Sequence, residues 1–301
     1  MTPPLPAFGV SEFTTWPWTF EQDVENYARL GVEAIEICEF KLDPARIADQ
    51  LALAKDAGLT LSSVQPRLHS LFPDAPRPEP AAPADRMALL RQTIARFARY
   101  GAAETVFVSI TGAAPGGDFR AARATAVREY KALARFAADY GAKVALEPLN
   151  PILMNVDTFI CAIPDALSIV EEVAEPNLGI WLDVWHFFQD AAAEIHIATC
   201  KGKVLGVHLS DWHTPHCFGD RLAVGEGEIA PHLPGLLRAI AETGYAGAYT
   251  LEIFSEAHLR DSLWRGDMSA TITDSRAAFA QAWSAAWEAA EMSKWCSLPA
   301  R

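Results

Sequence analysis

The sequence predicts an α/β protein with one domain, a (β/α)8 TIM barrel that spans residues 1–301. Two observations predict this fold. Short apolar runs alternate with helical stretches eight times along the chain. Strands separated by helices must run parallel, and eight of them close a barrel of this type. In addition, 50% of the residues are hydrophobic and the mean hydropathy is +0.07, so the chain can bury a large core.

A doubly wound sheet is the competing fold. It would bind its ligand where the strand order reverses, usually beside a glycine-rich turn after the first strand. Residues 8–15 contain a single glycine, and the glycine-containing loop at 112–118 has no lysine of the phosphate-binding type. We therefore favour the barrel and predict no nucleotide site.

The first half of the chain contains four of the expected strands. Gly31, Gly58 and Gly101 follow helical stretches, as C-caps do. Asp43 followed by Pro44 is typical of a helix N-cap and first turn. The expected elements are, in order, a strand at 8–13, a helix at 20–30, a strand at 34–38, a helix at 43–58, a strand at 59–64, an irregular proline-rich surface loop at 73–83, a helix at 85–100 and a strand at 105–109.

The second half repeats the pattern with four more strands. Gly141 and Gly244 again follow helical stretches. The expected elements are a helix at 119–140, a strand ending at Glu147, a helix at 166–174, a strand from 179 to 183, a helix at 190–199, a strand at 204–208, a long loop at 211–229, a helix at 232–243, a strand at 249–254 and a helix at 273–292.

Four successive strands of this half end in residue types that bind metal ions. In order, these residues are Glu147, Asp183, His208 and Glu252. The carboxyl ends of barrel strands all face one side, where active sites are built, so the four side chains are expected to converge. One acid alone would be explained more simply as a helix cap or a loop contact. Four matching strand ends are hard to explain as an accident.

Converging carboxylates need a counter-charge. Three of them within a few ångströms repel one another unless they are protonated or neutralised. A divalent cation provides the neutralisation, and three oxygen donors with one imidazole suit Mn²⁺, Mg²⁺, Co²⁺ or Zn²⁺. We expect one such ion, with Mn²⁺ as the first choice. Arg221, in the long loop after the seventh strand, is the candidate to balance the remaining negative charge.

Other side chains allow two interpretations. His186, three residues after Asp183, either packs against Trp185 or hydrogen-bonds a ligand, and Arg221 is alternatively a solvated loop charge. Three histidines lie in loops and are expected to face solvent: His69, His213 and His216. Four tryptophans are expected to pack in the core or at the barrel rim, with one or two walling the pocket, because sugar rings stack on aromatic faces: Trp16, Trp18, Trp185 and Trp212.

Composition restricts the partners and the compartment. The net charge is −13, and phosphate contacts need a basic face, so no nucleic-acid partner is expected. No apolar run approaches the ~18 residues of a membrane span. The N-terminus lacks the basic start and apolar stretch of a secretory signal. The five cysteines form no Cys-x-x-Cys pair, which favours reduced thiols in a cytoplasmic enzyme.

With these residues in place, the chain resembles the xylose-isomerase-like, metal-dependent barrel superfamily of sugar isomerases and epimerases. That group includes ketose 3-epimerases, hydroxypyruvate isomerase, and inosose isomerases and dehydratases. The resemblance covers nearly the whole chain and is most specific over 147–252. It implies a metal site formed by Glu147, Asp183, His208 and Glu252, and substrate contacts from His186 and Arg221.

In the epimerases of this superfamily the two ligand glutamates also form the acid–base pair. The resemblance therefore assigns catalytic roles to Glu147 and Glu252. Barrels of this type often pair through their helices, so a homo-oligomer is a further expectation.

The resemblance implies an isomerase or epimerase that acts on a keto-sugar or keto-cyclitol, a small polyhydroxylated carbonyl compound. The metal would bind the carbonyl and an adjacent hydroxyl oxygen, acidify the carbon between them and stabilise the enediolate. One glutamate would remove the proton. The other would return it on the opposite face, or the same one would return it to the neighbouring carbon. If the enolate instead expelled a leaving group, the enzyme would be a dehydratase or lyase.

One departure from the ketohexose epimerases concerns the substrate. These enzymes usually carry a second glutamate six residues after the first metal ligand, where it contacts the terminal hydroxyls of the sugar. This chain has Leu153 at that position. The substitution leaves room for a cyclitol, a keto-glycoside or a smaller keto acid.

Two other functions fit less well. DNA-repair nucleases of the endonuclease IV type share the fold but hold three zinc ions with additional histidines. His69 matches one of these, whereas Ser109 stands in place of another, and residues 220–222 read Asp-Arg-Leu where Asp-x-His is expected. A catalytically silent, sugar-binding barrel subunit is disfavoured because every expected ligand is present.

Overall fold

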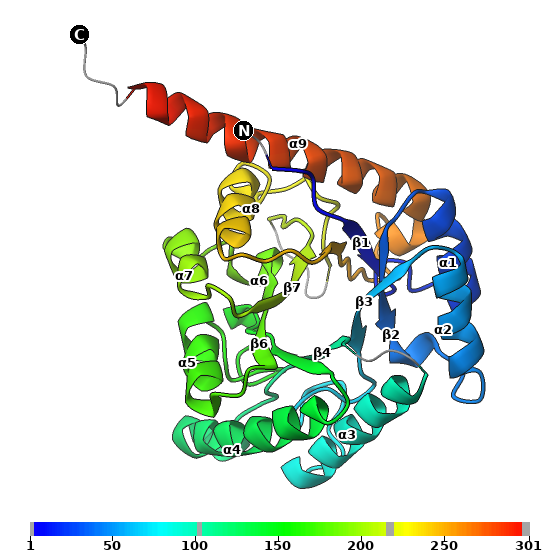
Figure 1. Ribbon diagram of the computed structural model, residues 1–301, viewed down its shortest axis with the longest axis vertical. Coiled ribbons are helices and arrows are strands. Elements are labelled where there is room, and N and C mark those ends of the chain that lie inside the picture. The colour runs from blue at the N-terminus through cyan, green and yellow to red at the C-terminus, as the bar shows by residue number, and fades with distance from the viewer. Residues whose placement is uncertain (1–2, 101–103, 215–219, 297–301) are drawn as a thin grey trace.

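Eight parallel strands form a closed barrel, which confirms the predicted fold class (Figure 1). The computed structural model describes residues 3–100, 104–214 and 220–296, with side chains as far as residue 288. Strand β8 closes the barrel against β1, with Val10 opposite Leu251. The strands are β1 (Phe8–Ser11), β2 (Ala34–Cys38), β3 (Thr60–Gln65), β4 (Val106–Ser109), β5 (Lys143–Leu146), β6 (Leu178–Asp183), β7 (Val204–Leu209) and β8 (Tyr249–Leu251).

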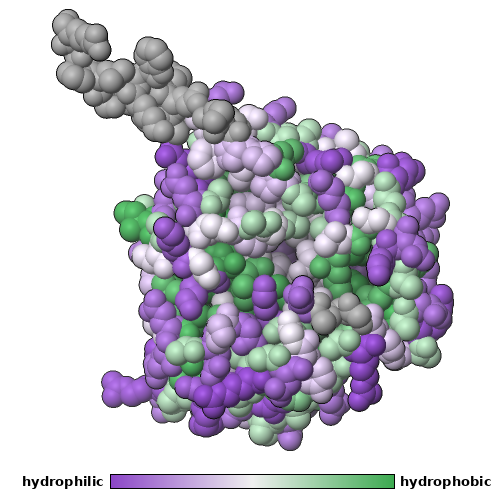
Figure 2. Space-filling model, in the orientation of Figure 1, coloured by the Kyte–Doolittle hydropathy of each residue, from purple (hydrophilic) through white to green (hydrophobic). Residues whose placement is uncertain are grey.

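Helices surround the barrel (Figure 1). The α-helices are α1 (Phe20–Arg29), α2 (Ile47–Asp56), α3 (Pro83–Arg99), α4 (Phe119–Ala138), α5 (Ile163–Val173), α6 (Val184–Phe187), α7 (Ala193–Thr199), α8 (Leu233–Glu242) and α9 (Met268–Cys296). Short 3₁₀ turns are η1 (Glu39–Lys41), η2 (Pro115–Gly117), η3 (Pro151–Leu153) and η4 (Leu263–Arg265). Figure 2 shows hydrophilic side chains over α3 and α4 at the lower rim, as expected for amphipathic helices that cover a barrel.

Local hydrogen bonds explain where the helices begin, and one predicted helix start is wrong. Helix α1 starts with a capping box, in which Thr19 and Gln22 each accept a hydrogen bond from the other's backbone N–H. The predicted N-cap at Asp43 is wrong, because α2 begins at Ile47. Asp43 instead forms a separate turn, in which its Oδ1 accepts from the N–H of Ala45 at 2.9 Å.

The glycines expected after helices behave as predicted where the structure describes them. All of these have positive φ, in the left-handed region that the position after a helix favours: Gly31, Gly58, Gly141 and Gly244. Gly101 lies outside the described residues.

Inside the barrel, a buried tryptophan packs against one of the predicted metal ligands. Trp181 of β6 is 1% exposed and lies against Gly206 of β7. A Cβ atom at position 206 would lie 1.8 Å from the indole, so only glycine fits there. The indole meets the His208 ring edge to face, with 4.7 Å between the ring centroids. A glycine on one strand thus makes room for the tryptophan that supports a predicted metal ligand.

The proline-rich loop at 73–83 is irregular, as predicted, and its last proline opens α3. It is not purely a surface loop. Asp74 is 4% exposed, and Pro76 and Arg77 line the central cavity. Within the described residues, no helix combines the length and the apolar character that a membrane crossing requires.

Candidate metal centre and cavity

The structure brings the four predicted metal ligands together. Glu147, Asp183 and Glu252 lie at the carboxyl ends of β5, β6 and β8, around the imidazole of His208 on β7. His208 Nδ1 lies 3.2 Å from Glu252 Oε2, 3.6 Å from Glu147 Oε1 and 4.0 Å from Asp183 Oδ2. None of the four residues is more than 5% exposed. These four residues are called the metal-ligand cluster below, after the role predicted for them.

The donor atoms of this cluster fit a divalent cation. His208 Nδ1 and Glu147 Oε1 are buried and form no hydrogen bond within the described part of the chain. Buried polar atoms without partners are rare and costly, and a bound cation would satisfy both of these atoms. Oxygen donors with one imidazole nitrogen suit a cation of the Mn²⁺ or Zn²⁺ type.

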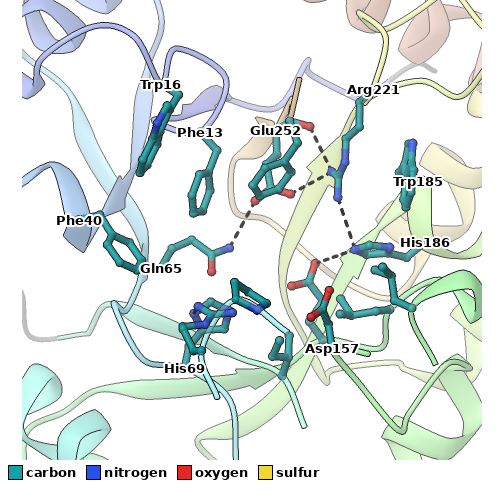
Figure 3. Close-up of a pocket in the computed structure, with 17 residues that line it drawn as sticks. Phe13, Trp16, Phe40, Gln65, His69, Asp157, Trp185, His186, Arg221 and Glu252 are labelled. Atoms are coloured by element: carbon teal, nitrogen blue, oxygen red, sulfur yellow. Dashed lines mark hydrogen bonds and ion pairs between the residues drawn. The ribbon is translucent and has the colours of Figure 1, made fainter. Parts of the chain in front are cut away.

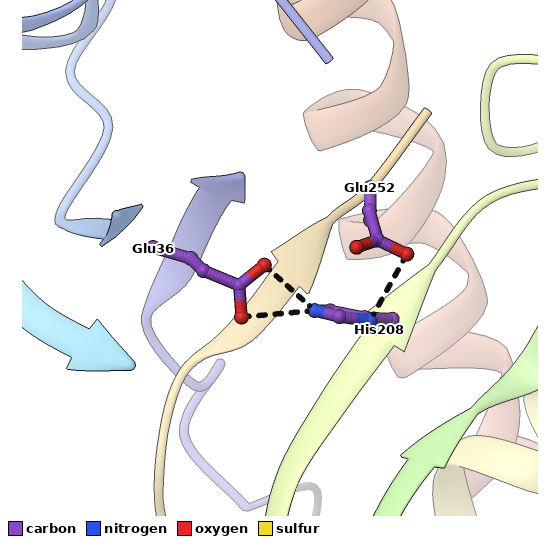
Figure 4. Close-up of side chains that lie close together, drawn as sticks. All are labelled: Glu36, His208 and Glu252. Carbon is purple, nitrogen blue, oxygen red and sulfur yellow. Dashed lines mark hydrogen bonds and ion pairs between the residues drawn. The ribbon is translucent and has the colours of Figure 1, made fainter. Parts of the chain in front are cut away.

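Glu36 completes the arrangement, and the sequence analysis missed it. His208 Nε2 donates to the Glu36 carboxylate, with distances of 3.0 and 3.1 Å to its two oxygens (Figure 4). Ser63 Oγ donates to the same carboxylate at 2.6 Å. A carboxylate on the outer nitrogen fixes the histidine tautomer and leaves Nδ1 for a metal. Without a metal, burial opposes protonation of His208, but Glu252 and Glu36 raise its pKa well above the usual range.

Arg221 lies where the sequence analysis expected a balancing charge. It is 4% exposed, so the alternative of a solvated loop charge is wrong. Its Nη1 donates to Asp183 Oδ2 at 2.8 Å and to Glu252 Oε2 at 2.9 Å. Burial alone would raise the pKa of Asp183, but the guanidinium lowers it below the usual value. The guanidinium lies over the Trp185 ring, 4.8 Å from its centroid, which holds the charge in position.

The structure confirms one interpretation of His186, packing against Trp185, and the other, a hydrogen bond to a ligand, stays a prediction. Its ring meets Trp185 edge to face, with centroids 5.2 Å apart, and it also lines the cavity. Nδ1 accepts the backbone N–H of Asn150 at 3.1 Å, so the ring proton lies on Nε2, which is 3.4 Å from Asp183 Oδ2. Burial lowers the pKa of His186 to about 3, so the ring is neutral and Nε2–H is a donor.

Local structure explains how Asp183 takes part. It is the N-cap of the four-residue helix α6, and its Oδ1 accepts from the N–H of Trp185 at 2.9 Å. The other oxygen is left for the cluster. The sequence presented a helix cap and a metal ligand as alternative roles for such an acid. Asp183 can have both roles, because each uses a different oxygen of its carboxylate. Glu147 differs, since burial raises its pKa to about 7, in the range where a carboxyl group can gain or lose a proton.

A cavity of about 500 Å³ opens beside the cluster (Figure 3). Trp16 and Trp185 line it, as expected for one or two of the tryptophans, and Leu153 also lines it. The other residues lining it are Phe13, Phe40, Gln65, His69, Pro76, Arg77, Ile110, Glu147, Leu149, Asp157, His186, Arg221, Glu252 and Phe254. About half of all the lining side chains are apolar, and the charged ones include Arg77 and Asp157 as well as Glu147, Glu252 and Arg221.

The expected positions of the other histidines and tryptophans need partial correction. His69 is 8% exposed, so its predicted solvent-facing position is wrong, and Arg77 Nη1 lies 2.9 Å from its Nδ1. His213 is partly buried, with Nε2 3.4 Å from Asp220 Oδ2, and His216 lies outside the described residues. Trp18 and Trp212 pack against the core.

Additional zinc sites find no support. Ser109 Oγ donates to the carbonyl of His69 at 2.6 Å, and Asp220 Oδ1 accepts from Ser255 Oγ at 2.8 Å. Within the residues that the structure describes, both side-chain groups able to hold a metal include His208. The two groups therefore share one position in the described structure.

The chain is similar to sugar-converting barrels in sequence. A sequence model of the xylose isomerase-like TIM barrel family matches residues 24–279. An L-ribulose 3-epimerase from Methylomonas sp. (strain DH-1) is 30% identical over 241 residues, which is 77% of each chain. An inosose isomerase from Halalkalibacterium halodurans is 34% identical over 128 residues, 40% of this chain and 43% of that one.

Solved structures agree on the fold. A protein from Sinorhizobium meliloti 1021 superposes with a TM-score of 0.80 at 23% identity, over 93% of this chain and 99% of that one. An L-ribulose 3-epimerase structure gives a TM-score of 0.73 at 20% identity, with 98% and 99% covered. An IolI protein with a bound zinc atom also gives 0.73 at 20% identity, with 92% and 98% covered.

Proposed function

The chain belongs to the xylose isomerase-like TIM barrel family, and we propose that it is a divalent-metal-dependent sugar isomerase or epimerase. Its substrate in this proposal is a keto-sugar or keto-cyclitol. The similarity to an L-ribulose 3-epimerase over 77% of the chain supports the reaction class. The similarity to an inosose isomerase, although over 40% of the chain, supports a ring ketone as an alternative to an open ketose.

One observation carries the proposal. Two glutamates, Glu147 and Glu252, both line the cavity and both approach His208 Nδ1, at 3.6 and 3.2 Å. They come from β5 and β8, which are separated by two strands of the barrel. A substrate between them would present opposite faces of one carbon to two carboxylates, as inversion at that carbon requires.

The metal-ligand cluster would hold the divalent ion. When bound, this ion polarises the substrate carbonyl and so acidifies the neighbouring C–H bond. Glu147 and Glu252 then transfer protons. One takes the proton from carbon and the other returns it on the opposite face, which gives epimerisation. If the same glutamate returns the proton to the adjacent carbon, the result is isomerisation.

His186 and Arg221 have supporting roles in this mechanism. The neutral His186 ring carries its proton on Nε2 and can donate it in a hydrogen bond to a substrate oxygen. Arg221, paired with Asp183 and Glu252, offsets the negative charge of the acids and keeps their oxygens in place. A substrate that covers the apolar cavity walls would displace water from the site and so strengthen each of these contacts.

The direct test is proton exchange with solvent. The enzyme is purified, loaded with Mn²⁺ and incubated in D₂O with L-ribulose, D-fructose and an inosose, and NMR follows deuterium at the carbon next to the carbonyl. We expect exchange with at least one of these compounds and its loss in EDTA. Exchange that continues in EDTA would contradict the metal-dependent mechanism. A conjugated enone absorbing in the ultraviolet would instead identify a dehydratase or lyase.

A further inference from the structure

One side of the cavity is a continuous aromatic surface. Four side chains form it, and they are called the aromatic wall: Phe13, Trp16, Phe40 and Phe254 (Figure 3 labels the first three). Phe13 stacks on Trp16 with centroids 5.6 Å apart and lies 4.6 Å from Phe254. Trp16 meets Phe40 edge to face at 6.4 Å. Figure 3 shows Trp16, Phe13 and Phe40 on the side of the cavity opposite Trp185 and His186.

The aromatic wall is partly open to a ligand. Arg67 lies over the Phe40 ring, 4.8 Å from its centroid, and Trp264 stacks on Trp16 with centroids 6.5 Å apart. Trp16 is 40% exposed and Phe40 is 38% exposed, whereas most aromatic side chains of the barrel helices and strands are buried. An exposed apolar cluster inside a cavity costs solvation free energy unless something covers it, and such patches usually mark binding sites. Large aromatic faces favour another ring in stacked or edge-to-face contact.

The segment that carries the wall is firmly held. Thr14 Oγ1 donates to the carbonyl of Leu251 and accepts the N–H of Ile253, both at 3.0 Å, which ties the loop after β1 to β8. Trp264 Nε1 donates to the carbonyl of Phe13 at 3.0 Å. Lys41 Nζ donates to the carbonyl of Thr15 at 3.0 Å. A surface fixed in this way binds without the entropy loss of ordering a loop.

The cavity is larger than one sugar ring. A hexose has about twelve non-hydrogen atoms, and even at the ~30 Å³ that one water molecule takes up in the liquid these would fill roughly 360 Å³. Bonded atoms pack more closely than separate waters, so this figure is an upper bound. The cavity measures about 500 Å³, within the range of sites that hold drug-sized ligands. Space therefore remains beside a sugar held at the acids.

That remaining space is apolar on more than one side. Leu149, Leu153 and Ile110 also line the cavity, so the aromatic wall is supplemented by aliphatic surface. Gln65 lies between the wall and the acids, with its Nε2 3.5 Å from Glu252 Oε1. Three polar residues line the cavity as well, and each already has a partner in the chain. Arg77 pairs with Asp74 at 2.7 Å and lies 2.9 Å from His69 Nδ1, and Asp157 Oδ1 accepts the N–H of Ala75 at 3.1 Å. The cavity thus has a charged subsite for a reacting carbonyl and, next to it, a largely apolar subsite.

We propose that the substrate is a glycoside-like ketone in which the reacting sugar or cyclitol ring carries an aromatic substituent that stacks on the aromatic wall. The sugar or cyclitol ring in this proposal rests on the proposed function. The aromatic substituent is the part that is added here. An aryl group fits better than a second sugar, because each buried hydroxyl of a sugar needs a hydrogen-bond partner. The four members of the wall present ring carbons, and Trp16 carries the single polar ring atom among them.

Binding of matched probes tests the apolar subsite without relying on turnover. Calorimetry on the Mn²⁺-loaded enzyme compares phenyl β-D-glucoside, methyl β-D-glucoside and cellobiose. We expect the phenyl compound to bind roughly 10- to 100-fold more tightly than the methyl compound, as burial of one ring implies. Trp16→Ala and Phe40→Ala should each remove most of this preference and leave the methyl affinity unchanged. Phe119→Ala, at an equally exposed phenylalanine (43%) outside the cavity, should change neither.

Solvent exchange with the 3-keto derivatives of the methyl and phenyl glucosides separates the two proposals. Faster exchange of the phenyl derivative that depends on Trp16 supports both. Exchange at equal rates, with no effect of Trp16→Ala, overturns the aryl proposal and leaves the proposed function intact. Cellobiose binding as tightly as the phenyl compound would also overturn it, in favour of a second sugar. Tight aryl binding that is lost in Trp16→Ala, without any exchange, would support the subsite and count against the proposed reaction.

Discussion

The chain buries two groups of carboxylates near the carboxyl ends of its strands, and they are balanced differently. One is the metal-ligand cluster of Glu147, Asp183, His208 and Glu252. The other, called the lysine cluster here, consists of Glu12, Asp23 and Lys41. The carboxylate side chains of the lysine cluster are 0% exposed and that of Lys41 is 6% exposed. The two groups are therefore alike in burial and differ in what neutralises them.

The lysine cluster contains its own cation. Lys41 Nζ contacts Asp23 Oδ2 and donates to the backbone carbonyl of Glu12 at 3.4 Å. Thr15 Oγ1 donates to Asp23 Oδ1 at 2.6 Å, and Glu12 Oε2 accepts the N–H of Cys38 at 2.8 Å. Burial and the neighbouring Asp23 raise the pKa of Glu12 well above the usual range, so a proton can remove the remaining charge.

The metal-ligand cluster is not completed from within the chain. Arg221 pairs with one oxygen each of Asp183 and Glu252. It leaves His208 Nδ1 and Glu147 Oε1 without a hydrogen bond among the described residues. The comparison teaches that burial of acids does not by itself mark a site. Glu12 Oε1 of the lysine cluster also lacks a hydrogen bond within the described residues, but it lies 3.9 Å from the Lys41 ammonium. What distinguishes the metal-ligand cluster is an open imidazole nitrogen beside an open carboxylate oxygen, a pair that a metal cation can bind.

The largest difference between the clusters should appear in turnover. Glu252→Gln removes a proton acceptor at the carbon and should lower the exchange rate by about 10²- to 10⁴-fold. Glu147→Gln should do likewise, and both variants should also weaken metal binding. Far-ultraviolet circular dichroism should show an intact fold in both variants. Full activity in either one would refute its acid–base assignment.

In the lysine cluster the large effect should be on stability. Lys41→Met leaves two buried carboxylates without their cation, and breaking a buried pair in this way costs about 3–5 kcal/mol of unfolding free energy. Urea unfolding measures it. Lys55→Met, at an exposed lysine near the end of α2, is the control and should cost less than ~0.5 kcal/mol. Equal losses in the two variants would show that Lys41 does not neutralise the cluster.

Glu36 should affect metal affinity, through the hydrogen bond by which it orients His208. Glu36→Gln removes the charge from the carboxylate that orients the ring and should weaken metal affinity by about 10- to 100-fold. Competition with a fluorescent chelator measures the affinity directly. Glu39→Gln is a matched control, since Glu39 is also buried but pairs with Arg96 at 2.6 Å. Unchanged affinity in Glu36→Gln would limit Glu36 to a packing role.

The smallest expected effect is a pH dependence of stability in the lysine cluster. Burial raises the pKa of Asp23 to about 6, and the pKa of Glu12 is also raised, so the folded state binds protons more tightly than the unfolded state. Stability from this pair is therefore complete below pH ~4 and is lost as pH rises through the folded pKa values.

Glu12→Gln keeps an acceptor for Cys38 but cannot ionise. Its unfolding free energy should accordingly rise relative to that of the unchanged protein by about 1 kcal/mol between pH 5 and pH 8. Urea unfolding at the two pH values measures this difference. A difference that shrinks with rising pH would have the wrong sign for this account.

Much of the fold and the residues at the strand ends of the site could be predicted from the sequence. A barrel strand is a short apolar run, and a ligand at its carboxyl end interrupts that run, so Glu147, Asp183 and Glu252 were visible. Glu36 was not, because in Ala-Ile-Glu-Ile-Cys it occupies the middle of a strand. Alternating Ile and Glu is equally typical of a strand with one solvated face.

The remaining errors concern contacts between distant segments. His69 lies just before the proline-rich loop at 73–83 and was expected in solvent. Arg77 of that loop pairs with Asp74, lies 2.9 Å from His69 Nδ1 and lines the cavity. The aromatic wall is assembled from the segments after β1, β2 and β8. No local pattern links Phe13, Phe40 and Phe254. Such features depend on how loops pack in space, which periodicity and spacing do not specify.

The central claim is that the metal-ligand cluster is built for a cation that the chain itself does not supply. Elemental analysis of protein purified without chelator tests it most directly, with Glu252→Gln alongside. We expect about one equivalent of Mn, Co, Mg or Zn per chain, and less in the variant. Absence of metal, even after incubation with each of these ions, would contradict the claim, because the open atoms of His208 and Glu147 would then have to be satisfied in another way.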